Sequence, residues 1–312
     1  MSGRLLILCW HNVTPTWFFP GPRGAHLRGL AAQVKVLRRF CTPVDLESAL
    51  DDLSVGRRLP PRAVALTFDD GYRDNLDEAL PLLEELGAPA TYFLVSGLLD
   101  GETAPWWELL GWAFARSAPR TVTWRGRSVR GGASPQRYPD FWRQAEELKT
   151  FDRGERETAL EELVDVLAPA GPAPNWHRMF LDWDGAREMA SRATVGSHTR
   201  WHGILSRESR TEQAAELAHA AERIRGELGV AARTLAYPNG GRDDYDDGSI
   251  QGAQSAGHDY AVTTESGLNS HPIAPFQVQR LVLDPLDGAT VLRRVLRSPG
   301  LGGWLRRPRS SP

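Results

Sequence analysis

The sequence predicts an α/β fold that forms one large domain. Strand-like apolar runs alternate with helical stretches in two blocks of the chain. The chain has 312 residues, of which 41% are hydrophobic, so it can bury a substantial core, and α/β barrels often reach this size as a single domain. We expect this domain to span residues 1–300 and a basic, flexible tail to follow at residues 301–312.

The first block starts with the strand Leu5–Cys9 and ends with the strand Ala90–Val95. Gly87 marks the end of a helical stretch just before the second of these strands. The elements expected between the two strands are helices near Gly29–Arg39, Leu46–Leu53 and Leu76–Leu86 and the strand Val64–Phe68.

The second block begins near Thr194. Ser209 and Glu212 have the spacing of a capping box ahead of an Ala-rich helix, and Gly229 is typical of the residue that ends such a helix. The helix presents one apolar face, made of Leu217, Ala221, Ile224 and Leu228. The elements expected after it are the strands Arg233–Tyr237, Tyr260–Thr264 and Gln279–Asp284 and a helical segment near Ile250–Ala256.

Residues from about 100 to 182 interrupt this alternation and are predicted to be an insertion. They include charged helical pieces at Ala145–Lys149 and Arg156–Leu167. They also hold six of the chain's eleven tryptophans, namely Trp106, Trp107, Trp112, Trp124, Trp142 and Trp176. Packing of the insertion onto the rest of the domain accounts best for most of these large side chains.

Two adjacent carboxylates, Asp69 and Asp70, end the apolar strand that precedes Gly71. Neighbouring side chains at a strand end point to opposite sides of the backbone. One carboxylate can therefore bind a metal ion while the other stays free to handle a proton. Taken alone, Asp-Asp-Gly also fits a solvated turn in which the glycine supplies a positive φ.

Two histidines, His198 and His202, are candidates for the further ligands that a metal ion at these carboxylates would need. Residues four apart lie on one side of a helical turn and can reach one ion, at roughly 2.0–2.1 Å each if the ion is zinc. The pair lacks the Glu of the helix-borne zinc-protease motif, and alone it would fit surface histidines. One Asp and two His make a three-ligand site open to water, whose pKa zinc lowers from 15.7 toward about 7. Together the two motifs predict a metal-dependent hydrolase.

These motifs resemble those of the polysaccharide deacetylases of carbohydrate esterase family 4, also called the NodB homology domain. The resemblance covers most of the chain. Thr67–Gly71 with Asn75 matches the family's first motif, Gly196–His202 the second, and Ala236–Gly240 stands where the third belongs. Flanking segments that agree with the family are Leu8–Val13, Ala90–Leu94 and Gln279–Leu283.

The resemblance implies a distorted (β/α) barrel with its site at the carboxyl ends of the strands. In such barrels, catalytic groups collect on the loops that follow the strands. By resemblance, Asp69 would be the general base, and Asp70, His198 and His202 would hold the metal. The default metal for such a ligand set is Zn²⁺, although cobalt, nickel, manganese and iron can occupy similar ligands.

The third motif departs from the family pattern at two positions. Many members have Arg-x-Pro-Tyr-Gly, whereas this chain has Ala236-Tyr237-Pro238-Asn239-Gly240. Arg280 on a late strand is our candidate for the missing arginine, which in the family orients the catalytic acid. Asn239 can still offer its backbone N–H to an oxyanion. Tyr237 and Pro238 are further candidates for the substrate cleft.

No histidine matches the family's general acid. His258 is expected at the surface and His271 in a loop, so neither is assigned a role. His11 follows the first strand and is a candidate for the same rim as the metal. Trp201, between the two metal histidines, is a candidate for lining the cleft, and Trp106 or Trp107 for stacking on a sugar ring.

The activity implied is removal of N-acetyl groups from an amino sugar in a polysaccharide, oligosaccharide or glycoconjugate. Three alternatives remain open: a sugar deformylase, an O-acetyl esterase on the same fold, and a glycan-binding module whose catalysis has decayed. The altered third motif and the missing general acid favour the last of these. The intact set of two carboxylates and two histidines favours an enzyme.

Composition limits the cellular setting. The chain has 37 basic and 39 acidic residues, a net charge of −2, which gives no indication of a nucleic-acid partner. Its two cysteines, Cys9 and Cys41, cannot form a disulfide framework. The apolar run after Arg4 is too short for a signal peptide, and we expect no transmembrane segment and a cytoplasmic protein.

A cluster of arginines turns the C-terminal segment basic. A solvated tail is the simplest interpretation, and weak contact with an anionic membrane surface is an alternative. The cluster consists of Arg293, Arg294, Arg297, Arg306, Arg307 and Arg309.

Overall fold

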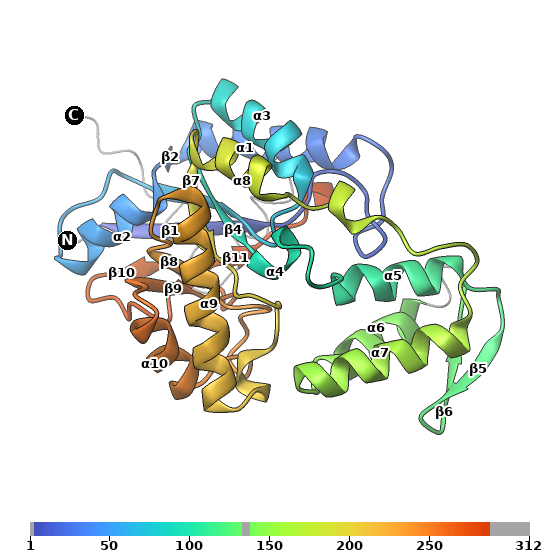
Figure 1. The fold of residues 1–312 in the computed structure, drawn as a ribbon. Helices are drawn as coiled ribbons and strands as arrows, with labels where there is room; N and C mark the ends of the chain where they lie inside the picture. Colours follow the sequence, from blue (N-terminus) through green and yellow to red (C-terminus); the bar gives the residue numbers. More distant parts are fainter. Residues whose placement is uncertain (1–2, 133–137, 288–312) are drawn as a thin grey trace.

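A mixed sheet with helices packed around it forms the body of the molecule (Figure 1). The computed structural model describes residues 3–132 and 138–287, so the predicted basic tail lies outside the described residues. The sheet runs in the order β10-β1-β3-β4-β7-β8-β9, with β2 beside β3 and β11 beside β1. Its pairings are parallel except that of β1 with β10. The strands are β1 (Arg4–Trp10), β2 (Thr42–Pro43), β3 (Ala63–Phe68), β4 (Ala90–Leu94), β7 (Thr194–Ser197), β8 (Thr234–Ala236), β9 (Tyr260–Val262), β10 (Asn269–Ser270) and β11 (Leu281–Val282).

The late segment around β11 brings the two edges of the sheet together. Val278 forms a parallel bridge with Val262 of β9, and Leu281 pairs with Leu8 of β1. The backbone N–H of Leu283 also donates to the carbonyl of Cys9 at 2.8 Å. The result is the distorted α/β barrel that the resemblance implies. The late strand is shorter than the predicted Gln279–Asp284, because only two of its residues pair in register.

Successive side chains of β1 and β3 point alternately to the outside of the barrel and to its interior. Leu6 and Leu8 pack in the cluster beneath the helices, whereas Leu5 and Ile7 pack in the cluster within the barrel. This period of two is the ordinary consequence of strand geometry. Cys9 continues the inward series on β1, and Thr67 continues it on β3 (Ala63, Ala65). The interior therefore changes from apolar to polar toward the carboxyl ends of these strands.

Helices follow the strands as predicted, with small shifts at their ends. A π-helical turn, Asn75–Ala79, begins the helical stretch that the sequence places near Leu76–Leu86. The capping box of Ser209 and Glu212 is present, and Gly229 adopts a left-handed φ of 68° at the end of its helix. The helices of the barrel are α1 (Ala25–Phe40), α2 (Leu46–Ser54), α3 (Leu80–Glu85), α4 (Ser96–Leu99), α8 (Trp183–Ala190), α9 (Arg210–Leu228) and α10 (Asp247–Ser255). Short 3₁₀ turns lie at Trp176–Arg178, Leu205–Arg207 and Pro285–Asp287.

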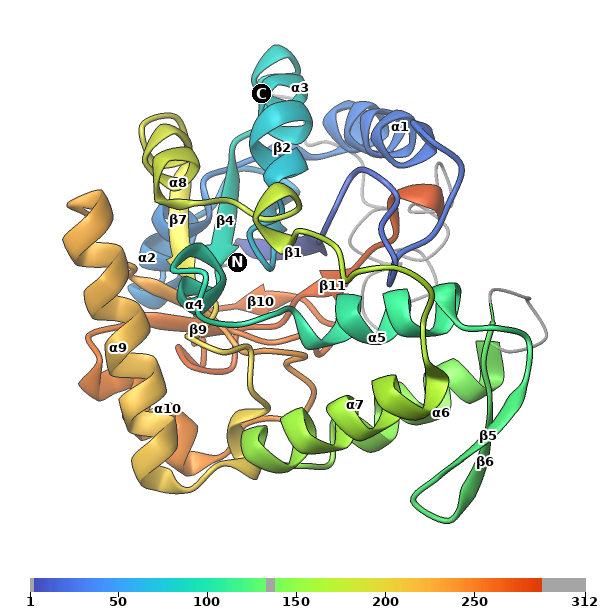
Figure 2. The same ribbon diagram turned by 45° about the vertical axis from the view of Figure 1, so that its right-hand side comes forward.

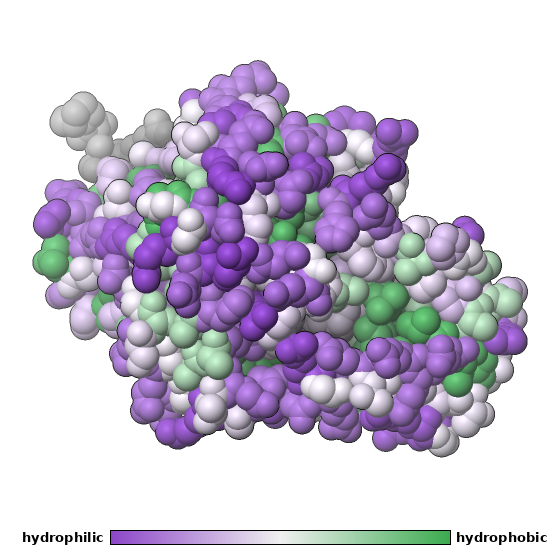
Figure 3. All heavy atoms as spheres, in the orientation of Figure 1, coloured by the Kyte–Doolittle hydropathy of each residue, from purple (hydrophilic) through white to green (hydrophobic). Residues whose placement is uncertain are grey.

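The insertion forms a lobe beside the barrel with a hydrophobic cluster of its own (Figures 1 and 2). Its elements are α5 (Trp106–Arg116), the hairpin of β5 (Thr121–Trp124) and β6 (Arg127–Arg130), α6 (Tyr138–Leu148) and α7 (Arg153–Leu167). The two charged helical pieces predicted from the sequence are parts of α6 and α7. On the face in Figure 3, hydrophobic side chains gather on this lobe.

Most tryptophans of the insertion are packing residues, as expected. Trp106, Trp107, Trp112 and Trp124 are all buried, whereas Trp142 is 44% exposed. The expectation of a surface position for His258 is wrong: its ring is buried, and its Nδ1 lies 2.6 Å from the carbonyl of Ala232. No helix in the described ranges is both long and apolar enough to cross a membrane.

Candidate metal centre and active site

The first motif leaves β3 through an unusual turn. Asp69 continues the inward series of β3, but Asp70 and Gly71 both have left-handed backbones, with φ of 75° and 77°. Non-glycine residues rarely adopt this region, and they concentrate where the chain must aim a functional group. Thr199, His202 and Asn239 also have φ between 53° and 64°. All three candidate motifs thus contain a residue in this rare conformation.

Asp70, His198 and His202 converge on one point. Oδ1 of Asp70 lies 3.3 Å from Nε2 of His198 and 3.3 Å from Nε2 of His202. All three side chains are buried. Nδ1 of His198 lies 2.8 Å from the carbonyl of Ala236, which requires the proton on that nitrogen and leaves a lone pair on Nε2. This is the usual outer support of a metal-bound histidine.

The donor set fits a divalent cation. Burial acts to raise the pKa of Asp70, but the two imidazoles outweigh it and hold that pKa well below its usual range. Oδ1 of Asp70 is buried without a hydrogen-bond partner in the described structure. Unpartnered polar atoms in a buried site are costly unless something else satisfies them. One oxygen and two imidazole nitrogens suit zinc and related ions.

Asp69 forms a bidentate ion pair with Arg280, the residue proposed to replace the missing arginine. The two Nη–O distances are 2.7 and 2.8 Å, and Arg280 is fully buried. Arg280 also donates to the hydroxyl of Thr67 at 3.1 Å and to the carbonyl of Thr263 at 2.9 Å. Burial alone would raise the pKa of Asp69, but the guanidinium lowers it below its ordinary value. The pair fixes Asp69 as an ionised carboxylate of defined orientation.

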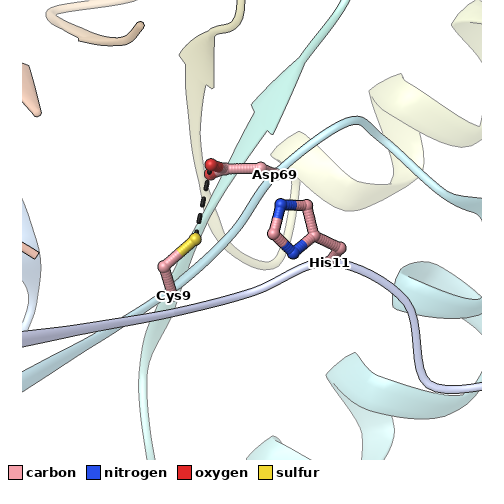
Figure 4. Close-up of side chains that lie close together, drawn as sticks. All are labelled: Cys9, His11 and Asp69. Atoms are coloured by element: carbon pink, nitrogen blue, oxygen red, sulfur yellow. Dashed lines mark hydrogen bonds between the residues drawn. The ribbon is translucent and has the colours of Figure 1, made fainter. Parts of the chain in front are cut away.

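Cys9 of β1 and His11, which follows β1 directly, face Asp69 (Figure 4). The thiol of Cys9 lies 3.3 Å from Oδ2 of Asp69, and burial raises the pKa of that thiol well above its ordinary value. A ligand atom of His11 lies within 4.8 Å of both residues. The amide of Asn75 donates to the carbonyl of His11 at 2.8 Å, so the first motif also holds the backbone of this histidine.

Two other groups of potential ligands fit a cation less well. In the group of Cys9, His11 and Asp69, both oxygens of Asp69 already bind a guanidinium. The third group contains Asp100, Glu102 and His219, and its two acids are paired with Arg223 and Arg200. A cation beside an arginine would meet like charge. The group of Asp70 is therefore the best metal site among the described residues.

The third motif contacts the metal set through the carbonyl of Ala236, which lies beside Nδ1 of His198. Asn239 and Gly240 form a left-handed turn, with φ of 56° and 69°, and the carbonyl of Asn239 accepts from the hydroxyl of Thr264. Nδ2 of Asn239 is buried without a partner. The ring of Tyr237 stacks on Tyr245 at 4.4 Å and is fully buried. Its side chain packs in the core, and its backbone N–H donates to the carbonyl of Val262 at 3.1 Å, so Tyr237 does not line a substrate cleft in this structure.

The tryptophans proposed to contact sugar pack against other protein side chains. The guanidinium carbons of Arg153 and Arg200 lie 4.0 and 4.1 Å from the ring centre of Trp201. Trp201 lines a pocket of about 400 Å³ with residues of α7 and α9. Trp106 and Trp107 are at most 7% exposed. Pro238, the remaining cleft candidate, is also buried.

One contact at the site was not foreseen. The ring of Trp107 in the insertion lies 4.4 Å from the ring of His202. Nothing in the sequence signals this contact, since 95 positions separate the two residues. Cys9 was assigned no role at the site, although its spacing of two from His11 predicts that both side chains point to the same side of the chain.

An α/β barrel with an Asp-Asp turn and two converging imidazoles at its strand ends has the arrangement of a hydrolase with a candidate metal site. Comparison with known proteins then gives the family. The model of the polysaccharide deacetylase family matches residues 56–121 and 148–261, more than half of the chain. The chain belongs to the polysaccharide deacetylase family and is a carbohydrate deacetylase, a hydrolase that acts on carbon–nitrogen bonds.

Solved structures share the fold at low sequence identity. The deacetylase PplD of Streptococcus pyogenes, solved with acetate, has a TM-score of 0.62 and 17% identity, covering 96% of this chain and 100% of that chain. IcaB of Ammonifex degensii has a TM-score of 0.60 and 18% identity over 98% and 99% of the two chains. A de-N-acetylase of Aggregatibacter actinomycetemcomitans has a TM-score of 0.59 and 18% identity over 93% and 99%. No curated protein matches the sequence.

Proposed function

We propose that this deacetylase removes N-acetyl groups from an amino sugar with the help of a divalent metal, Zn²⁺ being the first candidate. The convergence of Asp70, His198 and His202 on one point carries the proposal. A divalent ion held there supplies Lewis acidity, which lowers the pKa of a bound water and polarises a carbonyl. The similarity of the fold to a protein named as a de-N-acetylase supports the amide substrate.

Asp69 takes the role of general base. It is the carboxylate of the pair that lies outside the metal set, and its ion pair with Arg280 keeps it ionised. It accepts the proton of the attacking water while Arg280 fixes the direction of its lone pairs. Positioned general bases contribute about 10²- to 10⁴-fold to such reactions.

Asn239 contributes a hydrogen-bond donor for the oxyanion. Its backbone N–H lies in a left-handed turn and donates to no protein group in the hydrogen bonds of the described residues. Donors that are fixed before the reaction stabilise the negative charge of an acyl-transfer oxyanion at no cost of reorganisation.

His11 is our candidate for protonating the leaving amine. It is half-buried, beside Asp69, and it is not part of the metal set. Phe19 stacks on its ring at 5.3 Å and limits its rotation. A proton donor is needed because the amine of a sugar is a poor leaving group until it gains a proton. We expect His11→Gln to lower kcat for amide substrates and to spare the metal content.

A substrate panel tests the function. The metal-loaded enzyme would be given N-acetyl, N-formyl and O-acetyl forms of amino-sugar oligomers, and release of acetate or formate would be measured. Faster hydrolysis of the N-acetyl forms supports the proposal, whereas preference for N-formyl or O-acetyl forms favours the deformylase or the esterase. Binding of oligomers by metal-loaded protein without release from any of them would revive the binding module.

A further inference from the structure

The two metal-site histidines differ in what holds their rings. His198 has a conventional support, since its Nδ1 hydrogen-bonds to the carbonyl of Ala236 on β8. Nδ1 of His202 is buried and has no hydrogen-bond partner in the described structure. The backbone of His202 is fixed, with φ of 53° and its N–H donating to the hydroxyl of Thr199. These contacts leave the rotation of the imidazole itself without a hydrogen-bonded restraint.

The ring of Trp107 supplies the missing restraint by packing. Its centre lies 4.4 Å from that of His202, at an interplanar angle of 45°, and Trp107 is 4% exposed. Phe180 and Trp106 meet Trp107 edge to face, with ring centres 6.0 Å away in each case. A close-packed wall of this kind allows few orientations of a neighbouring ring.

A buried hydrogen-bond chain holds Trp107 in turn. Nε1 of Trp107 donates to the hydroxyl of Tyr72 at 2.8 Å, and that hydroxyl donates to Oε1 of Glu108 at 2.7 Å. Oε2 of Glu108 accepts from the backbone N–H groups of Trp17 and Phe18, both at 3.0 Å. Glu108 is fully buried, and each of its oxygens is hydrogen-bonded.

We infer that Trp107 is a positioning residue for the ligand His202, and that the chain of Tyr72 and Glu108 fixes it in that position. The insertion is then part of the metal site, although none of its described residues is in the metal set. The inference rests on the proposed function, because it concerns the ring that would hold the metal. It assigns to the insertion a task in metal binding that is separate from sugar recognition.

Metal affinity is the property to measure. Trp107→Leu and Trp107→Phe would be compared with the wild type by chelator competition for Zn²⁺ and by the visible absorption of the Co²⁺-substituted protein. Loss of an outer support of a ligand typically costs 10- to 100-fold in affinity. We expect a loss of about tenfold or more for Trp107→Leu, with a changed Co²⁺ spectrum. Trp107→Phe keeps a ring beside His202 and should lose less.

Trp112 provides a matched control. It lies on the same helix, α5, and is buried to a similar degree, at 6% exposed, but it has no ring contact with His202. Trp112→Leu should therefore lower the melting temperature as Trp107→Leu does and leave the Zn²⁺ affinity and the Co²⁺ spectrum unchanged. Tyr72→Phe removes the acceptor of Trp107 and should weaken Zn²⁺ binding in the same direction as Trp107→Phe.

The outcomes separate this inference from the function on which it rests. Wild-type protein that binds neither Zn²⁺ nor Co²⁺ would overturn the proposed metal site. Tight binding by the wild type with equal affinity in Trp107→Leu would overturn the positioning role alone. If Trp107→Leu does not fold, the Trp107→Phe and Tyr72→Phe variants decide, and wild-type affinity and spectrum in both would contradict the inference.

Discussion

The barrel and the insertion hold the same candidate site by different physical means. The barrel supplies polar groups at strand ends and fixes them through hydrogen bonds, as β8 does for His198. None of the described residues of the insertion belongs to the metal set, and the insertion holds His202 by packing the ring of Trp107 against it. The difference indicates that a support made by hydrogen bonds to a regular sheet can be predicted from short sequence motifs. A support made by packing depends on how a segment distant in the sequence folds against the site.

The largest effect should come from removing the ligands that the two regions support. We expect His198→Ala/His202→Ala to lose its metal and its deacetylase activity, because one carboxylate cannot hold the ion. The measurement is metal content by mass spectrometry beside acetate release. About one divalent ion per wild-type chain and none in the variant is the expected result. An equal metal content in both proteins would place the ion elsewhere.

Removing the general base should leave the metal in place. Asp69→Asn is expected to lower kcat by about 10²- to 10⁴-fold, because the amide cannot accept a proton. Metal content should match the wild type, since Asp69 is not in the metal set. Single-turnover acetate release beside metal analysis measures both. Activity within a few-fold of the wild type would assign the base elsewhere.

Breaking the buried ion pair between Asp69 and Arg280 should lower the stability of the protein. Arg280→Gln leaves the buried Asp69 without its charged partner, and breaking a buried pair in this way costs about 3–5 kcal/mol in the free energy of unfolding. The double variant Asp69→Asn/Arg280→Gln removes both charges and should be more stable than Arg280→Gln. Urea unfolding of the metal-free wild type, of Asp69→Asn, of Arg280→Gln and of the double variant gives the four free energies of unfolding. Strict additivity of the two substitutions would show that the pair does not couple.

The link between the insertion and the barrel should give a smaller effect. Glu108→Gln replaces a carboxylate that accepts from two backbone N–H groups and from Tyr72. Because the amide end of glutamine cannot accept, at least one of these donors loses its partner, at a cost of about 1–3 kcal/mol. Thermal unfolding would show the loss. A variant as stable as the wild type would mean that this carboxylate is not needed to join the two regions.

Much of the barrel half of the site could be predicted from the sequence. Asp69, Asp70, His198 and His202 stand in short motifs whose spacing already places them at strand ends, and the structure brings them together. Arg280 was foreseen only because the third motif lacked an arginine. Its approach to Asp69 depends on the late segment that joins the two edges of the sheet, and local sequence does not encode that joining.

The contribution of the insertion to the site could not be predicted from sequence motifs. Trp107 carries no motif, and its neighbours on α5 are equally aromatic. Burial of the tryptophans followed from their size, but the one that meets His202 is selected by how α5 packs against the turn after Asp70. The metal identity, the roles of the site residues and the cytoplasmic location stay predictions.

The smallest expected effect gives the reference for the others, because the substitution lies in the barrel and removes no contact of Asp70, His198 or His202. Ser209 caps α9 by accepting from the backbone N–H of Glu212, and Ser209→Ala removes this bond. Such a cap contributes about 1 kcal/mol. We expect that loss in the free energy of unfolding and no change in Zn²⁺ affinity or in kcat. A change in metal affinity here would mean that any destabilisation of the molecule loosens the site, and the contrast between Trp107 and Trp112 would then have to be judged at matched stability.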